Sequence, residues 1–164
     1  MVPPVLIFAI GNESRGDDAI APLLLRRLAS WLETENIAGQ FELLEDFQLQ
    51  IEHAADIAGR ELILFIDAGM DTLDPYSFYR AQYNDSRTLF SHAITPEAVL
   101  STFRQVFQKT PPPAFVLCVR GEQFELGAPL SPQAEKRMVL AWELLHALTR
   151  NAEASDWENR TTPV

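Results

Sequence analysis

The chain has 164 residues, of which 47% are hydrophobic and 22% are charged, as is ordinary for a single globular domain. Its net charge of −10, from 23 acidic and 13 basic side chains, has the wrong sign for a surface that binds nucleic acid or an anionic membrane. The one cysteine, Cys118, lies inside an apolar run, which favours a buried core thiol over a disulfide or a zinc site. No signal peptide is recognisable and no apolar run approaches the ~20 residues that span a bilayer, so we expect a cytoplasmic protein.

Apolar runs alternate with amphipathic segments up to residue 67. Val5–Ile10 and Glu61–Ile66 have the nearly continuous apolar pattern of strands that are buried on both faces. Between them the pattern predicts a helix within residues 18–32, a short strand at Gln40–Glu45 and a helix from Phe47 to Ala58. Strands that alternate with helices in this way indicate a parallel sheet with right-handed crossovers.

The second half departs from this alternation. Ser77–Tyr83 follows the preceding strand too closely for a crossover helix, so we expect it to pair antiparallel or to lie at an edge. Thr95 and Ser131, each followed by proline, predict the N-caps of two further helices. Ala114–Val119 is predicted as the last core strand, with Glu122–Leu126 as a short edge extension.

These elements predict one α/β domain over residues 1–150, with helices on both faces of a doubly wound, mostly parallel sheet of about five strands. One of the strands is expected to be antiparallel or at an edge. Residues 151–164 are polar and aperiodic, and we expect them to form a frayed tail.

Three side chains that can bind a metal are expected to meet at one edge of this sheet. Asp18 follows the first strand and Asp67 ends the third, and these strands are neighbours in the common order 2-1-3-4-5. His92 lies in a loop that is long enough to return to the same edge. Two carboxylates and an imidazole suit a divalent ion that also holds water or a substrate.

Each of these residues also has a purely structural interpretation. Asp18 is equally compatible with a helix cap, Asp67 with an Asx-turn at a strand end, and His92 with a solvated loop. A dinucleotide site is disfavoured, because the first turn lacks G-x-G-x-x-G and Asp17 stands where a pyrophosphate needs positive potential. A conventional protease is not supported either, since the sequence has no G-x-S-x-G elbow.

The motifs around these residues resemble those of the hydrogenase maturation endopeptidases. They are Gly11-Asn12 with Asp17-Asp18-Ala19-Ile20, then Phe65-Ile66-Asp67-Ala68, then Ser91-His92-Ala93-Ile94-Thr95-Pro96. Their order and intervals are typical of the family, and the resemblance covers residues 5–150. Two further segments, 47–53 and 119–127, resemble the branch that serves NAD-reducing, bidirectional hydrogenases.

The resemblance implies an endopeptidase that removes the C-terminal extension of the [NiFe] hydrogenase large-subunit precursor once nickel has been inserted. It implies that Asp18, Asp67 and His92 contact the metal and carry the catalysis, with Asp18 standing where many relatives have glutamate. The nickel would belong to the substrate, although another divalent ion could bind the isolated protein, which we expect to be a monomer. The identity of the general base stays open, and Asp17 is expected to cap the following helix.

Three departures from the family pattern concern the shape of the substrate cleft. Ala9 replaces the first glycine of G-x-G-N, Ala21-Pro22 replaces a glycine-containing helix start, and Glu45-Asp46-Phe47 replaces a turn rich in glycine and threonine. Two functions of other classes stay open. One is a non-catalytic assembly factor that binds nickel or the large subunit, and the other is a flavodoxin-like binding module, which the acidic first loop disfavours.

Overall fold

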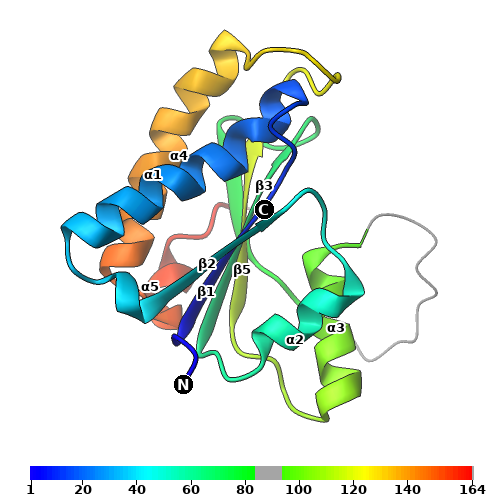
Figure 1. Cartoon of the computed structure of the whole chain (residues 1–164), viewed down its shortest axis with the longest axis vertical. Coiled ribbons are helices and arrows are strands. Elements are labelled where there is room, and N and C mark those ends of the chain that lie inside the picture. Colours follow the sequence, from blue (N-terminus) through cyan, green and yellow to red (C-terminus); the bar gives the residue numbers. More distant parts are fainter. Residues whose placement is uncertain (84–93, 164) are drawn as a thin grey trace.

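One mixed sheet with the strand order β2-β1-β3-β5-β4 forms the centre of this computed structural model, which describes residues 1–83 and 94–163 (Figure 1). β1 pairs in parallel with β2 and β3, and β3 pairs in parallel with β5. β4 runs antiparallel to β5 at the edge of the sheet. The α/β fold, the adjacent first and third strands and the antiparallel edge strand are therefore as predicted. The strands are β1 (Val5–Ile10), β2 (Phe41–Asp46), β3 (Leu62–Gly69), β4 (Tyr76–Arg80) and β5 (Ala114–Arg120).

Helices cover both faces of the sheet. On one face α1 (Ile20–Thr34) packs beside α4 (Pro132–Arg150), and on the other α2 (Ala54–Ile57) packs against α3 (Pro96–Phe107) (Figure 1). Successive side chains of a strand point to opposite faces, so Ile7 of β1 joins one hydrophobic cluster while Phe8 joins the other. Every residue of β1 is buried, which explains why this strand has no polar side chain. Within residues 1–83 and 94–163, no helix combines the length and the apolar character needed to cross a bilayer.

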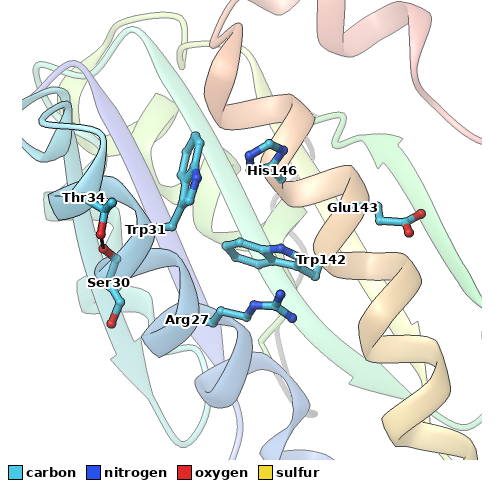
Figure 2. A pocket seen from close by; sticks show the side chains of 7 residues that line it. All are labelled: Arg27, Ser30, Trp31, Thr34, Trp142, Glu143 and His146. Carbon is cyan, nitrogen blue, oxygen red and sulfur yellow. Dashed lines mark hydrogen bonds between the residues drawn. The ribbon is translucent and has the colours of Figure 1, made fainter.

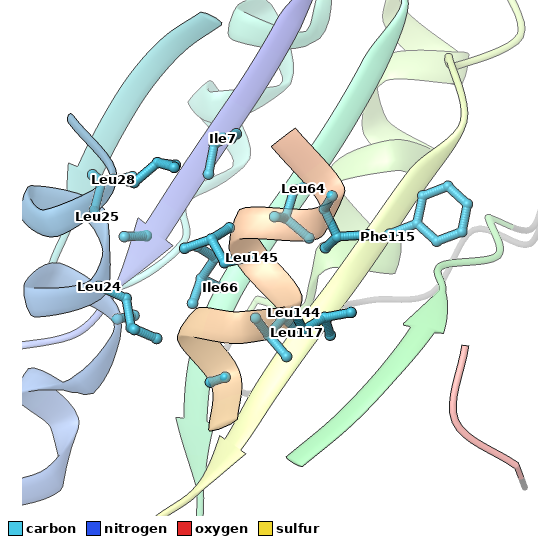
Figure 3. Close-up of a cluster of buried hydrophobic side chains, with 14 of the residues drawn as sticks. Ile7, Leu24, Leu25, Leu28, Leu64, Ile66, Phe115, Leu117, Leu144 and Leu145 are labelled. Carbon is cyan, nitrogen blue, oxygen red and sulfur yellow. The ribbon is translucent and has the colours of Figure 1, made fainter. Parts of the chain in front are cut away.

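The larger of the two clusters lies between the sheet and the α1–α4 pair (Figure 3). Leu24 and Leu28 stand one turn apart on α1 and are almost completely buried. Leu145 of α4 and Ile66 of β3 belong to the same cluster and are fully buried. This packing holds the start of α1 against the carboxyl ends of β1 and β3.

Two predicted elements are wrong in part. The helix predicted from Phe47 begins later, as a short 3-10 turn, η3 (Ile51–His53), that leads into α2. The segment before it is held out of the helix because the Asp46 carboxylate accepts the Phe47 N–H at 2.7 Å and His53 Nδ1 accepts the Gln50 N–H at 2.8 Å. Residues 122–126 form a loop instead of an edge strand, because the Asp17 carboxylate accepts the N–H groups of Glu122 and Gln123.

The C-terminal segment is not frayed over its described residues. Residues 154–159 form α5 (Ala154–Asn159), and Trp157 is fully buried at 0% exposure. Its ring packs edge-on against Phe115, with 5.4 Å between the ring centroids, and its indole N–H donates to the Leu148 carbonyl at 3.0 Å. The polar composition of the tail does not predict this packing, because a single aromatic side chain, Trp157, attaches the tail to the core.

We expect Trp157→Ala to lower the free energy of unfolding by about 3–5 kcal/mol, since it empties a closed aromatic site in the main core. Urea denaturation followed by circular dichroism measures this. Ser155→Ala, an exposed position on the same helix, is the matched control and should stay within about 0.5 kcal/mol of wild type. Equal stability of the two variants would contradict the anchoring role of Trp157.

Candidate active site

Asp18 and Asp67 line the same cleft at the carboxyl edge of the sheet. The cleft has a volume of about 380 Å³. It lies where β1 and β3 end side by side, the usual place for ligands in an open α/β sheet. Most of its remaining wall is apolar and includes Ile10, Phe47, Leu49, Ala68, Ile94, Pro96 and Phe124. The cleft therefore presents two acids on a largely apolar surface.

The loop after β1 folds back on itself to bring Asp18 into this cleft. Gly11 permits the fold, because a Cβ atom there would stand 2.0 Å from the Asp18 carbonyl oxygen. The chain then enters a 3-10 turn, η1 (Gly16–Ala19), in which Asp18 Oδ2 accepts the Asn12 N–H at 2.7 Å. The N-cap of α1 is Ala19, and no side chain caps this helix, so Asp18 is not the helix cap that was its alternative interpretation.

Asp67 lies inside the paired part of β3, in register with Cys118 of β5. Its Oδ1 accepts the Ala68 N–H at 2.8 Å, but the strand continues to Gly69, so no Asx-turn ends it here. The Cys118 thiol is half-buried, with its Sγ 3.1 Å from Thr72 Oγ1. Burial raises the pKa of this thiol, which disfavours the reactive thiolate.

Burial destabilises the charged form of both carboxylates. Burial raises the pKa of Asp67 to about 7, the hydrogen bond from the Ala68 N–H partly opposes this, and the nearby negative charge of Asp18 makes a smaller contribution that raises the pKa further. Burial also raises the pKa of Asp18, partly offset by the Asn12 N–H and by Arg15. No lysine or arginine forms an ion pair with Asp67 among the described residues. A divalent cation would balance this charge with oxygen ligands, so the pair fits a metal contact.

The third predicted site residue, His92, lies outside the described residues. Ile94, Thr95 and Pro96, which follow it in the sequence, line the cleft. Thr95 caps α3 as predicted, its Oγ1 accepting the Ala98 N–H at 3.1 Å. Within residues 1–83 and 94–163, no three His, Cys, Asp or Glu side chains form a metal-binding group. A complete ligand set therefore needs a donor from elsewhere, such as His92 or a bound substrate.

The whole chain is similar to several solved structures. It matches the [NiFe] hydrogenase maturation protease HycI from Thermococcus kodakarensis KOD1 with a TM-score of 0.67 and 21% identity, over 91% of this chain and 94% of the other. The match to the hydrogenase maturating endopeptidase HybD from Escherichia coli has a TM-score of 0.67 and 24% identity, over 93% and 94%. This chain has the fold of the [NiFe] hydrogenase maturation proteases. The sequence itself matches no family model and no curated protein.

Within this maturation-protease fold, Asp17 has a structural role that the sequence did not reveal. Its side chain is fully buried and points away from the cleft toward the loop after β5. Oδ2 accepts the Glu122 N–H at 2.7 Å, the Gln123 N–H at 3.3 Å and the Ser131 hydroxyl at 2.7 Å, and Oδ1 accepts the Ser131 N–H at 2.7 Å. Burial alone would raise the pKa of Asp17, but these donors outweigh it and hold the pKa below its usual value. Asp17 thus holds the loop of residues 122–131 in place and does not cap the following helix.

We expect Asp17→Asn to lower the free energy of unfolding by about 2–4 kcal/mol, because an amide NH₂ would face N–H donors in a buried site. This exceeds the loss of a helix cap, about 0.5–2 kcal/mol. Urea denaturation at pH 7 measures it, with the exposed Asp71→Asn as control. A loss below about 1 kcal/mol would mean that the buried network tolerates the amide.

The maturation-protease fold also has a groove of about 490 Å³ between α1 and α4 (Figure 2). The Trp31 and Trp142 rings stand nearly perpendicular there, and the Arg27 guanidinium lies 4.4 Å from the centre of the Trp142 ring. His146 contacts Trp31, with 4.4 Å between the ring centroids, and so is remote from Asp18 and Asp67. His53 is also occupied elsewhere, with Nε2 3.2 Å from Asp46 Oδ2. Neither of these histidines supplies the missing donor of the cleft.

Proposed function

We propose that this chain is a hydrogenase maturation endopeptidase that removes the C-terminal extension of the [NiFe] hydrogenase large-subunit precursor after nickel insertion. The observation that carries the proposal is the cleft in which Asp18 and Asp67 lie together, at the carboxyl edge of a fold shared with such proteases. The motif that contains His92 supports the same function from the sequence. The finer assignment to the branch for NAD-reducing hydrogenases stays a prediction, as do a cytoplasmic location and a monomeric state.

The nickel in this proposal belongs to the substrate. We infer that Asp18, Asp67 and His92 contact it and so detect whether the precursor has been loaded. Two oxygen donors and one nitrogen donor leave coordination positions that the precursor's own ligands can fill. A divalent ion beside a peptide bond can polarise the carbonyl or activate a water molecule.

The described residues of the cleft contribute orientation and charge. The Asn12 N–H holds one oxygen of Asp18, and the Ala68 N–H holds one oxygen of Asp67, so that each carboxylate keeps one oxygen free of these backbone donors. The apolar wall formed by residues such as Leu49 and Phe124 excludes water around the bound segment. Low solvent access strengthens the attraction between the paired carboxylates and a cation.

The test is to incubate the protein with a nickel-loaded, unprocessed large subunit and to follow the subunit by mass spectrometry. Shortening at the C-terminus is the expected result. Binding without shortening would overturn the protease assignment in favour of a non-catalytic assembly factor. If the protein neither binds nor shortens the subunit, the large-subunit precursor is not its substrate.

A further inference from the structure

Exposed apolar side chains stand on two loops at the carboxyl edge of the sheet. Met70 and Leu73 lie between β3 and β4, and Leu126 lies between β5 and α4. Their exposed fractions are 60%, 57% and 69%. We call these three residues the apolar rim. Both loops lie at the same end of the sheet as the start of α1, next to which Asp18 is placed (Figure 1).

Backbone hydrogen bonds join the rim loops to each other and to the loop that carries Asp18. The Gly121 N–H donates to the Gly69 carbonyl at 3.0 Å, which links the β5–α4 loop to the end of β3. The Gly127 N–H donates to the Ser14 carbonyl at 2.7 Å, directly beside Leu126. Ala68 and Phe124, which line the cleft, stand two positions from Met70 and Leu126, so the rim loops border the cleft.

Polar contacts made by the buried Arg137 hold both rim loops in place. Arg137 of α4 is only 9% exposed, and its Nε donates to Asp74 Oδ1 at 2.9 Å in the β3–β4 loop. Its Nη1 lies 2.8 Å from Glu122 Oε1 in the β5–α4 loop, where Asp17 accepts three backbone N–H groups. Because the loops are already ordered, a partner that covers the rim loses little free energy in fixing them.

Each rim loop also sets an acid beside an apolar side chain. Asp71 follows Met70 and Glu125 precedes Leu126, and both acids are exposed. Neither forms an ion pair with any residue in the described part of the chain. Within residues 11–19, 45–50, 67–75 and 121–130, Arg15 is the only basic residue, and Arg120 at the end of β5 contacts Thr72 and Glu122. The surface therefore offers apolar contact together with uncompensated negative charge.

We propose that the apolar rim, with Asp71 and Glu125, docks a basic and apolar segment of the protein substrate, in which lysine or arginine stands beside aliphatic or aromatic residues. This rests on the proposed function, since the rim adjoins the cleft that would hold the cut peptide. A second copy of the chain is disfavoured because it would bring the same acidic surface against itself. Nucleic acid and anionic lipid are disfavoured for the same electrostatic reason.

Charge and apolar contact act on different rates of binding. Unpaired carboxylates at the edge of an interface mainly attract the partner during approach, so their removal slows association and weakens its salt dependence. Apolar side chains that become buried mainly slow departure, so their removal speeds dissociation. The two kinds of rim residue can therefore be tested separately.

The experiment compares two double variants, Asp71→Asn/Glu125→Gln and Met70→Ser/Leu126→Ser, with the control Val106→Ser/Val139→Ser. The control residues are 67% and 55% exposed and lie on α3 and α4, outside the rim loops. Association and dissociation rates with the nickel-loaded precursor are measured at low and high salt, together with kcat and KM. We expect about 5–20-fold slower association at low salt for the acidic variant and about tenfold faster dissociation for the apolar variant. Both variants should keep kcat, and the control should match wild type.

Unchanged rates in both rim variants, or equal changes in the control, would overturn the docking proposal while leaving the proposed function intact, provided that wild type shortens the precursor. Tighter binding by Asp71→Lys/Glu125→Lys would also overturn it, because the partner would then be acidic. If wild type neither binds nor shortens the precursor, the docking proposal fails together with the proposed function. Thermal unfolding of each variant confirms that the exposed substitutions leave the fold unchanged.

Discussion

Asp67→Asn is expected to abolish cleavage of the nickel-loaded precursor and, in the absence of metal, to stabilise the fold near pH 8. The pKa of Asp67 is about 7 in the folded chain, against 3.8 for an ordinary aspartate. The folded state therefore binds more protons than the unfolded state between these values, and wild-type stability falls as the pH rises through that window. Asparagine cannot ionise, so the variant should gain about 2–4 kcal/mol over wild type above pH 7.

The measurement is the free energy of unfolding by urea from pH 4 to pH 8 in a chelating buffer, for wild type and variant. The two curves should diverge as the pH rises, whereas parallel curves would mean that Asp67 carries no buried charge. Asp71→Asn, an exposed and unpaired site within the described chain, should leave the dependence of stability on pH unchanged. Substantial cleavage by Asp67→Asn would remove this residue from the catalytic site. Asp18→Asn should also lose cleavage.

Cleavage is expected to require nickel in the large subunit and not to be rescued by nickel added to the protease alone. The cleft supplies an incomplete ligand set, so the isolated protein should bind divalent ions only modestly, and soft thiolate donors of the substrate should complete the shell. His92→Ala should then weaken association with the nickel-loaded subunit by about 100-fold and association with the nickel-free subunit far less. Binding curves for wild type and His92→Ala against both forms of the subunit measure this difference.

His146→Ala is the matched control, because His146 lies in the groove between α1 and α4 and not in the cleft. It should bind both forms of the subunit as wild type does. If wild type cleaves the nickel-free subunit at the same rate as the loaded one, the metal is not the checkpoint. Asp18, Asp67 and His92 would then need another role.

The α/β fold with β1 beside β3, and the proximity of Asp18 and Asp67, could be predicted from the sequence. The apolar runs that become β1 and β3 are buried on both faces, so they leave little choice between a strand and any other element. Because parallel strands end at one edge, the acids that follow these runs had to lie near each other. The motif that contains His92 is likewise a property of the sequence, and its role stays a prediction.

The sequence motif singled out Asp18, but only the tertiary structure shows why Asp18 and not Asp17 faces the cleft. The two residues are adjacent and chemically identical, so their own side chains do not explain the difference. The distinction comes from the N–H groups of Glu122 and Ser131, more than a hundred positions away in the chain, which enclose Asp17 and leave Asp18 for the cleft. Trp157 is buried for the same kind of reason, since its partner Phe115 lies on a distant strand. Local periodicity is set by neighbours in the sequence, whereas burial of a single polar or aromatic side chain is set by contacts that form only when distant segments pack together.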